Sequence, residues 1–309
     1  MWTGFVSDQF NLVIPSRNAG SAWEAVLDSL ETQSCQPGLR CLVDSESTDA
    51  TVALARTHGF SIEMIEPAQF NHGGTRQLMV DRYCDEGLVV FMTQDAQLVS
   101  PDALCRLLRP FDDPTVGAVY GRQLPRVGAG LIEAHARLFN YPETGHVCEF
   151  CDAERMGIKA AFMSNSFAAY RTEALAAVGG FPSGVILGED TIVAAKMLMA
   201  GWKVAYQADA QAYHSHDYNY LQEFRRYFDI GVLHAREFWM LDAFGKPEGE
   251  GGRFVRSELA YLLNRAPWLI PSAVVRTVLK YLGYRLGRME SIFPLGLKRY
   301  LSMHKGYWK

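Results

Sequence analysis

The chain has 309 residues, of which 49% are hydrophobic and 21% are charged. This composition is typical of a folded globular protein and excludes collagen-like, low-complexity and disulfide-scaffold chains. The net charge of −4 argues against a nucleic-acid-binding protein, but the charge is uneven along the chain. Residues 253–309 contain 11 Lys and Arg and 2 Asp and Glu, a balance of +9, whereas residues 1–252 carry −13. We therefore expect the two parts to face different surroundings.

The first residues contain no basic leader followed by an apolar stretch, and nowhere are 18 consecutive residues all apolar. We therefore expect neither a secretory signal nor a transmembrane helix, but a cytoplasmic protein. In that compartment the six cysteines should be reduced and mostly buried thiols. Cys148 and Cys151 form a single CxxC, which lacks the second pair that a structural zinc site needs.

Short apolar runs alternate with helical segments between residues 10 and 120. We predict strands at residues 10–14, 39–43, 61–65, 88–92 and 116–120. We predict helices at residues 21–32, 50–58, 74–83 and 101–108. This rhythm predicts an α/β domain with a mostly parallel sheet, in which ligands bind beyond the carboxyl ends of the strands.

The alternation of apolar runs and helical segments weakens after residue 125, and we expect loop and helix over residues 126–163. We predict further strands within residues 164–170 and 202–207, with a helix at 191–200 between them. From residue 220 onward the pattern is helical and basic. The sequence therefore predicts an α/β domain over residues 1–219 and a basic helical C-terminal extension over residues 220–309.

One segment of the extension, residues 273–289, has an apolar stripe at helical spacing. The stripe consists of Val275, Val278, Leu279, Leu282 and Leu286. Four basic residues of the same segment lie off the stripe: Arg276, Lys280, Arg285 and Arg288. Three interpretations stay open: a solvated basic face, an interfacial membrane anchor, and packing against another copy of the chain.

Several familiar nucleotide-binding and hydrolase signatures are absent, including a Walker A sequence, a full GxGxxG and a GxSxG elbow. Acidic and imidazole side chains instead follow predicted strands or open a helix. They are Asp44 in VDSESTD, Asp95 in FMTQDA, Glu189 and Asp190 in ILGED, and His214 and His216 in YHSHDY. A carboxylate at the tip of an apolar strand is costly unless water, a cation or a ligand meets it. The set suggests a divalent cation and a phosphate-bearing ligand.

The ordered motifs PSRN, VDSESTD, FMTQDA, GED and YHSH resemble the inverting nucleotide-sugar glycosyltransferases of family 2, which have the GT-A fold. The resemblance covers residues 10–220. Three further stretches, FNHGGTRQ, MSNSFAAYR and RRYFDIGV, are similar to bacterial rhamnosyltransferases of this family. Those enzymes use dTDP-L-rhamnose and build cell-surface polysaccharide. The resemblance therefore implies a rhamnosyltransferase whose acceptor is a saccharide, with a lipid-linked saccharide expected.

On the donor side, the resemblance implies that the first loop and the acidic loop hold the base and ribose of the nucleotide. Pro15, Arg17, Asp44 and Ser47 match those positions. His72, beside two glycines at a helix start, is expected to contact the donor. Arg76, on the same helix, is expected to reach the nucleotide or the donor sugar.

Thr93-Gln94-Asp95 lies where the family has its DxD motif. The first Asp is Thr here, so only Asp95 is kept as a carboxylate ligand, with Gln94 beside the donor. His214 is expected to supply a second protein ligand to Mn²⁺ or Mg²⁺.

The GED position implies the catalytic groups. Asp190 matches the general base that takes the proton of the acceptor hydroxyl, and Glu189 is expected to orient it or to bind the acceptor. One base facing the acceptor, with no clear second nucleophile, implies a single displacement with inversion.

Three other functions stay open. A hexosyltransferase that uses a UDP-sugar would share these motifs. A nucleotidylyltransferase would need a glycine-rich basic loop after the first strand, which PSRNAGSAW matches poorly. A non-catalytic sugar-binding module predicts loss of the base, yet Asp190 is present.

If the chain is a rhamnosyltransferase, the basic extension would place it on the inner face of the cytoplasmic membrane, near a lipid-linked acceptor.

Overall fold

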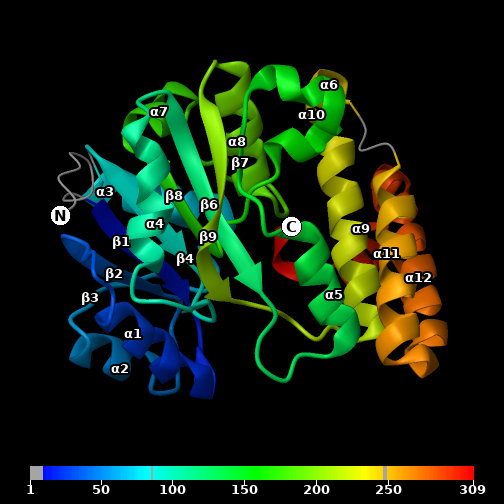
Figure 1. Ribbon diagram of the computed structural model, residues 1–309, viewed down its shortest axis with the longest axis horizontal. Helices are drawn as coiled ribbons and strands as arrows, with labels where there is room; N and C mark the ends of the chain where they lie inside the picture. Colours follow the sequence, from blue (N-terminus) through cyan, green and yellow to red (C-terminus); the bar gives the residue numbers. More distant parts are fainter. Residues whose placement is uncertain (1–9, 85, 246–248) are drawn as a thin grey trace.

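A twisted sheet runs through the middle of the molecule, with helices packed on both of its faces (Figure 1). The computed structural model describes residues 10–84, 86–245 and 249–309. The described strands are β1 (Phe10–Ser16), β2 (Leu39–Asp44), β3 (Ser61–Met64), β4 (Leu88–Met92), β5 (Gln97–Leu98), β6 (Val116–Leu124), β7 (His146–Cys148), β8 (Phe167–Arg171) and β9 (Lys203–Tyr213). Their order is β3-β2-β1-β4-β8-β6-β9-β5, and β7 pairs with β9.

Parallel and antiparallel pairing occur in different parts of this sheet. β3, β2, β1 and β4 are parallel neighbours, as are β6 and β9. β8 is antiparallel to both β4 and β6, and β5 and β7 are antiparallel to β9. The parallel strands at the N-terminal end therefore end at one edge, whereas the region after residue 125 contributes β8, which is antiparallel to both of its neighbours, and β7. The predicted α/β class is confirmed, with a mixed sheet.

Alternation along the strands creates a core on each face of the sheet. Leu12 and Ile14 of β1 pack on one face with α1 (Trp23–Glu31) and α4 (Ala103–Leu108). Val13 points to the other face, which α3 (His72–Tyr83), α7 (Thr172–Ala177) and α8 (Glu189–Met199) cover. Successive side chains of a strand point to opposite faces of the sheet, so a sheet that is covered on both faces has a separate core on each. The remaining helices before the extension are α2 (Thr51–Thr57), α5 (Leu131–Asn140) and α6 (Ala153–Met156).

The predicted strands and helices are present, with shifts at their ends. The helix predicted to start at Gly74 starts at His72, because the Asn71 side chain caps it by accepting the N–H of Gly74 at 2.8 Å. The strand predicted at 202–207 extends through Tyr213. β5 and β7 are two and three residues long, too short to show a pattern in the sequence.

The expectation that all six cysteines are reduced is wrong for two of them. Cys35 and Cys105 form a disulfide, although 70 residues separate them. The fold brings the turn after α1 beside α4, where the two Cα atoms lie 5.5 Å apart. The other four cysteines are thiols. Cys148 is buried whereas Cys151 is exposed, and neither belongs to a group of metal-binding side chains in the part of the chain that the structure describes.

The C-terminal extension is helical, as predicted, and it shares a core with the α/β part. Its helices are α9 (Tyr220–Arg236), α10 (Phe238–Phe244), α11 (Glu250–Arg265), α12 (Ile270–Arg288) and α13 (Leu295–Leu301). Phe228 and Val232 of α9 and Trp308 near the C-terminus belong to the same buried cluster as β1 and α8. The boundary predicted at residue 219 stays a prediction.

The packed face of α12 differs from the apolar stripe in the sequence. α12 packs on α9 through Gly283 and Gly287, and Gly231 of α9 lies against Gly287, so any side chain there would collide with backbone. Val278 and Leu282 consequently point to solvent. None of the described helices is both long enough and apolar enough to cross a membrane.

Candidate active site

A cleft of about 840 Å³ opens where β1 and β4 end and α8 begins. Nine of the residues predicted from the sequence line it: Pro15, Arg17, His72, Arg76, Gln94, Asp95, Glu189, Asp190 and His214. They come from five separate elements and loops, so the fold brings together side chains that lie up to about 200 residues apart. Asp44 and Ser47 are the two predicted residues outside its wall.

Two loops after β1 and β2 are tied together beside this cleft. The backbone N–H of Asn18 donates to Ser47 Oγ at 2.7 Å, and the N–H of Thr48 donates to Asn18 Oδ1 at 2.8 Å. Asn18 and Glu46 have φ of 48° and 56°, a left-handed conformation that these cross-bonds help to hold. The two loops therefore form one preorganised surface at the edge of the sheet.

Asp44 supports this surface from behind. Its carboxylate is fully buried and accepts hydrogen bonds from the backbone N–H of Ser47 at 2.7 Å and from Ser47 Oγ at 2.5 Å. The structure thus shows Asp44 and Ser47 bonded to each other, and their predicted nucleotide contacts stay predictions.

Gln94 joins the first loop to the end of β4. Its Oε1 accepts hydrogen bonds from Ser16 Oγ at 2.9 Å and from the N–H of Arg17 at 2.7 Å. Arg17 is exposed at the rim, where the Gln94 amide sets its backbone position. A side chain predicted to face the donor therefore also positions the loop that carries Arg17.

The acidic pair at the start of α8 has two different surroundings. Gly188 precedes it with φ 77°, and a side chain at that position would collide with Leu233 of α9. Asp190 Oδ2 accepts the N–H of Asn165 at 3.0 Å, and Oδ1 accepts the N–H of Thr191 at 2.8 Å. These bonds hold the Asp190 carboxylate in the wall of the cleft.

Glu189 is held by a buried ion pair. Its Oε1 lies 2.8 Å from Arg76 Nη1 and accepts a hydrogen bond from Asn165 Nδ2 at 3.1 Å. Burial opposes ionisation of Glu189, but the Arg76 guanidinium, His72 and the hydrogen bonds to the carboxyl together outweigh it and hold its pKa below the ordinary value. Arg76 is thus bound to the start of α8, with both partners at most 7% exposed.

The neighbouring carboxyl shifts in the opposite direction. Burial, followed by the negative charge of Glu189, raises the pKa of Asp190 to about 6. A carboxylate with a raised pKa is a stronger base than an ordinary aspartate and is still ionised at neutral pH. Two adjacent carboxyls whose surroundings push their pKa values apart are typical of a site of acid–base chemistry.

A second cluster lies at the end of β4, on the cleft's floor. Asp95 Oδ1 lies 3.4 Å from His214 Nε2, and Asp95 Oδ2 lies 3.8 Å from His216 Nδ1. One ligand atom from each of the three side chains lies within 4.8 Å of the others. Burial opposes ionisation of Asp95, but contacts with His214, Thr93 and His216 outweigh it and keep the pKa of Asp95 below its ordinary value. One carboxylate and two imidazoles are a donor set that suits Mn²⁺ or a similar cation.

The ring of His214 is oriented by Gln123. His214 Nδ1 lies 3.0 Å from Gln123 Oε1, so Nδ1 donates its hydrogen to this amide, and Nε2 is the ring nitrogen that faces Asp95. Gln123 is in turn held by Ser164 and Arg137. This is the arrangement that a neutral histidine ligand needs.

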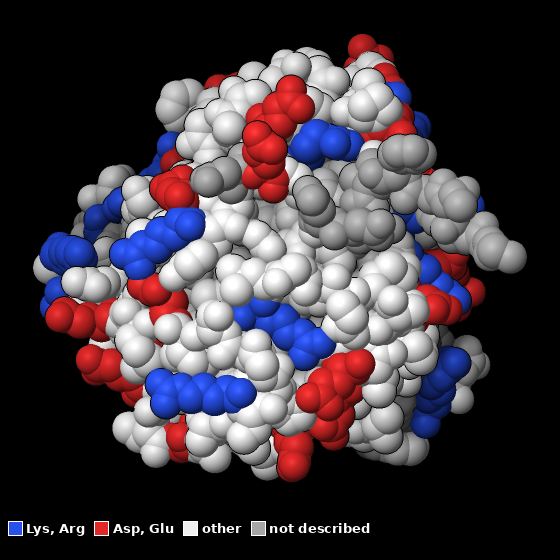
Figure 2. Space-filling view, turned by 90° about the vertical axis from the view of Figure 1, so that its left-hand side faces the viewer, with Lys and Arg blue, Asp and Glu red and all other residues white. Residues whose placement is uncertain are grey.

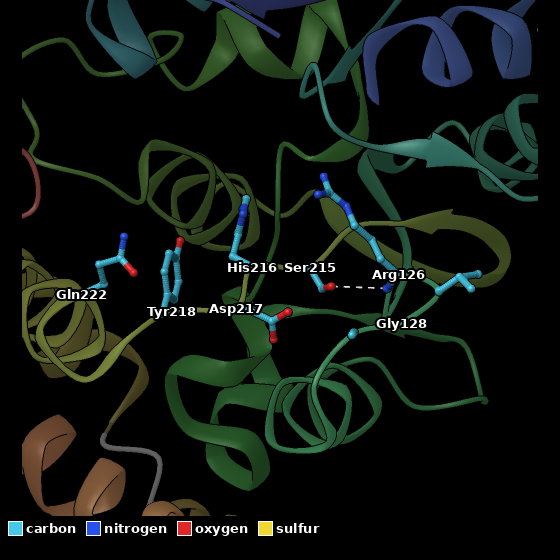
Figure 3. Close-up of a pocket in the computed structure, with 9 residues that line it drawn as sticks. Arg126, Gly128, Ser215, His216, Asp217, Tyr218 and Gln222 are labelled. Carbon is cyan, nitrogen blue, oxygen red and sulfur yellow. Dashed lines mark hydrogen bonds between the residues drawn. The ribbon is translucent and has the colours of Figure 1, made fainter. Parts of the chain in front are cut away.

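A loop pocket of about 380 Å³ adjoins this cluster (Figure 3). The Arg126 N–H donates to Ser215 Oγ at 3.2 Å and joins the loop after β6 to the loop after β9. Figure 3 shows Arg126 and His216 extending to one side of these loops and Asp217 to the other. Arg126 Nη2 lies 3.0 Å from Asp95 Oδ2, which adds a cation to the cluster.

Three residues of this region received no individual role from the sequence. The resemblance implied only His214 as a histidine ligand, yet both His214 and His216 meet Asp95. Asn165, which bonds both Glu189 and Asp190, lies in the MSNS stretch, whose letters identified a family but no role. Arg126 lies in the region in which the sequence rhythm weakens, and no signal in the sequence points to it.

Comparison with known proteins places this site in a family. Residues 8–229 match the glycosyltransferase-like family 2. The chain is 48% identical over 301 residues to the O-antigen chain rhamnosyltransferase RfbN of Salmonella typhimurium, covering 97% of this chain and 96% of that protein. It is 46% identical over 300 residues to the O-antigen chain rhamnosyltransferase WbaN of Salmonella anatum, covering 97% and 95%.

Two solved structures share the fold at low sequence identity. The mannosyltransferase PcManGT from Pyrobaculum calidifontis, solved in complex with GDP-Man and Mn²⁺, is 20% identical with a TM-score of 0.55 and covers 97% of this chain and 84% of its own. S. aureus TarS residues 1–349, solved in complex with UDP-GlcNAc, is 15% identical with a TM-score of 0.54 and covers 92% and 91%. Both similarities extend beyond residue 229, so they include much of the helical extension.

Proposed function

Because the chain belongs to the glycosyltransferase-like family 2, we propose that it is an inverting rhamnosyltransferase that uses dTDP-L-rhamnose in polysaccharide synthesis. The observation that carries this proposal is a single cleft that holds a basic carboxylate, Asp190, and a separate group of metal-binding side chains. The rhamnosyltransferases RfbN and WbaN, similar over nearly the whole chain, support the choice of sugar.

Asp190 is the general base of the proposed reaction. Its carboxylate takes the proton from the acceptor hydroxyl while that oxygen attacks the anomeric carbon of rhamnose. The bond from the anomeric carbon to the diphosphate breaks, and the diphosphate leaves with the electron pair. The attack occurs on the face opposite the leaving group, so the configuration of the sugar inverts.

Glu189 and Arg76 raise the proton affinity of Asp190 in this proposal. Because Arg76 keeps Glu189 ionised, a negative charge lies permanently beside Asp190 and raises its proton affinity. Asn165 holds the geometry by bonding to both carboxylates. We assign Glu189 as a positioning residue for Asp190, with His72 and Arg76 forming the wall beside the donor sugar.

Asp95 and His214, joined by His216, fit a divalent cation, and we propose that they hold Mn²⁺ or Mg²⁺. A cation bound there would offset the negative charge that builds on the leaving diphosphate. Gln123 keeps His214 in the tautomer that leaves Nε2 available as a ligand. Pro15, Arg17 and Gln94 form the adjoining wall for the nucleotide, and the bonded pair Asp44 and Ser47 stiffens it.

We further propose that the acceptor is a lipid-linked saccharide that the protein meets at a membrane surface. The outer face of α12, formed by Val274, Val275, Val278, Tyr281 and Leu282, leaves each of these side chains 45–59% exposed. Arg285 and Arg288 are exposed on the same helix, so the apolar face carries positive charge that suits anionic headgroups. On the side of the molecule away from the extension, Figure 2 shows basic and acidic side chains interspersed.

The proposed donor is tested by incubating the purified protein and Mn²⁺ with dTDP-L-rhamnose, UDP-glucose, UDP-galactose or GDP-mannose. At equal concentrations the ligand that binds most tightly raises the melting temperature most, so dTDP-L-rhamnose should raise it most. Membrane lipids extracted from a strain in which the gene is deleted should contain the accumulated acceptor and become labelled with rhamnose. Stabilisation and transfer by a UDP-sugar alone would establish the hexosyltransferase instead.

A further inference from the structure

The C-terminal end of the chain lies in the wall of the catalytic cleft. Met303 and His304 line the same cleft as Asp190, together with Arg226 of α9. Figure 1 shows the C-terminus in the middle of the molecule, between the sheet and α9, although the helices before it extend to the outer edge. The extension therefore returns to the site and completes it.

Buried bonds hold this tail in place. Asp229 of α9 is fully buried, and its Oδ2 accepts the N–H groups of Met303 at 3.0 Å and His304 at 3.1 Å. Trp308, 4% exposed, packs on Phe228 in the main core. A charge-assisted pair of backbone bonds and a buried indole fix residues 303–308 against α9.

His304 presents an unsatisfied polar atom in this wall. Its ring meets the ring of His72 edge-on at 5.3 Å, next to the Glu189–Arg76 pair. Its Nε2 is buried and has no hydrogen-bond partner among the described residues. Burial lowers the pKa of His304 to about 3, so the imidazole is neutral and can donate or accept one hydrogen bond. A buried polar atom left unpaired lowers stability, and a bound ligand removes that cost.

Arg226 is a second polar group of the same wall without a protein partner. No hydrogen bond or ion pair joins its guanidinium to another residue in the described ranges, although it lines the cleft. The neighbouring Arg225 behaves differently, because its Nε donates to the carbonyl oxygen of Tyr300 at 3.0 Å outside the cleft. Arg225 thus binds the backbone of the extension, whereas Arg226 lines the cleft.

The position of these groups indicates which substrate they meet. The loops proposed for the nucleotide follow β1 and β2, which Figure 1 shows at the left of the sheet, whereas α9 lies at the right of the molecule. The diphosphate end of the donor belongs at Asp95 and His214. Leu233 of α9 lies against Gly188 at the start of α8, so α9 and the tail line the part of the cleft beside Asp190. The acceptor must stand beside Asp190 for that carboxylate to reach its hydroxyl.

We propose that His304 and Arg226 bind hydroxyl groups of the acceptor saccharide, so that the C-terminal extension supplies the acceptor half of the cleft. This inference rests on the proposed transfer reaction. A neutral imidazole and a guanidinium are suited to sugar hydroxyls, which both donate and accept hydrogen bonds. Asp229 is a positioning residue in this arrangement, since it holds His304 through the backbone.

The test uses the full chain with the substitutions His304→Ala and Arg226→Ala. The probe is the membrane lipid extract of a strain in which the gene is deleted, used with labelled dTDP-L-rhamnose. Each substitution should raise the apparent KM for the extract about tenfold, the usual cost of losing one or two hydrogen bonds. The KM for dTDP-L-rhamnose and the calorimetric affinity for dTDP with Mn²⁺ should stay within about twofold of wild type.

Two further variants separate binding from folding. His304→Gln keeps a side-chain donor and acceptor and should recover part of the acceptor KM. Lys305→Ala changes the exposed neighbour in the same tail and should behave as wild type. An unchanged acceptor KM in His304→Ala and Arg226→Ala, or an equal rise in both KM values, would overturn the acceptor assignment. Failure of the wild-type protein to transfer from dTDP-L-rhamnose would instead refute the proposed function and this inference with it.

Discussion

At the scale of single residues, the site depends on two adjacent carboxyls that the fold places in different surroundings. Glu189 has a buried guanidinium as its partner, whereas Asp190 accepts two backbone N–H groups and the Thr191 hydroxyl. The first is therefore kept as an anion, and the second has a raised proton affinity. This difference supports the proposal that Asp190 is the general base.

Asp190→Asn should lower kcat by about 10²–10⁴-fold, because the amide has nearly the same shape and can keep one of the two backbone bonds but cannot take a proton. Binding of dTDP with Mn²⁺, measured by calorimetry, should stay within about twofold of wild type. Asp209→Asn, at an exposed position of β9, serves as the matched control. Turnover near the wild-type rate in Asp190→Asn would remove Asp190 as the base.

The dependence of kcat on pH should reveal the effect of the Glu189 charge on the pKa of Asp190. Asp190 acts as a base only when ionised, so kcat should fall about tenfold per pH unit below its pKa of about 6. Glu189→Gln removes the neighbouring negative charge, which lowers the pKa of Asp190 and moves the acidic limb of the profile to lower pH. An acidic limb at the same pH in both proteins would contradict the coupling of the two carboxyls.

The proposed metal site predicts a larger effect from loss of a ligand than from loss of the residue that orients a ligand. Asp95→Ala should abolish the difference in dTDP affinity with and without Mn²⁺, because it removes the carboxylate ligand. Gln123→Met removes the acceptor that orients His214 and should weaken Mn²⁺ binding by roughly 10- to 100-fold. Calorimetry is the measurement for both variants. A wild-type affinity for dTDP that does not respond to Mn²⁺ would contradict the assignment.

At the scale of elements, α12 shows how packing decides which face of a helix is buried. The sequence left open whether its apolar stripe meets a membrane, another copy of the chain or neither, and the structure shows that Gly283 and Gly287 provide the closest approach to α9. Arg276 and Lys280 lie on the packed side, where both pair with Glu223 of α9. Val275, Val278 and Leu282 are thereby left at the surface, in the position that an interfacial helix requires, whereas Leu286 packs on the core.

The outer face of α12 can be tested in the full chain, which is preferable to truncation because Trp308 belongs to the core. Val278→Glu should weaken co-sedimentation with vesicles containing anionic lipid by about tenfold, since it removes apolar burial and adds negative charge. Met64→Glu, at an exposed site on β3, is the control. Equal vesicle binding by the wild-type protein, Val278→Glu and Met64→Glu would refute the membrane face. If light scattering instead shows a wild-type dimer that Val278→Glu dissociates, the outer face of α12 binds a second copy of the chain.

At the scale of the whole molecule, the disulfide Cys35–Cys105 closes a long segment that includes β2, β3 and β4. A cross-link of this span stabilises mainly by restricting the unfolded chain, by about 2–4 kcal/mol. Dithiothreitol should therefore lower the free energy of unfolding in urea by that amount. The double variant Cys35→Ser/Cys105→Ser should be equally destabilised and insensitive to the reductant. No effect of the reductant on the wild-type protein would show that the bond does not form.

Much of the fold was predictable because its signals are local. The apolar runs of β1, β2 and β4 and the segments between them predict an α/β domain, and nine of the predicted site residues meet in one cleft. The antiparallel strand β8 and the short strands β5 and β7 were harder to predict, since pairing direction depends on distant partners. Arg126 was not predicted for the same reason, because its place in the site depends on an ion pair with Asp95, which is distant in the sequence.

The sequence by itself determined the alternation of strands and helices, the order of the motifs, and the family to which those motifs belong. These properties depend on residue type and spacing along the chain, which any reader of the sequence can see. Only the tertiary structure decided the pKa difference between Glu189 and Asp190, the disulfide, the outward face of α12 and the return of His304 to the cleft. Each of these depends on burial and on contacts between residues far apart in sequence, which exist only once the chain has folded.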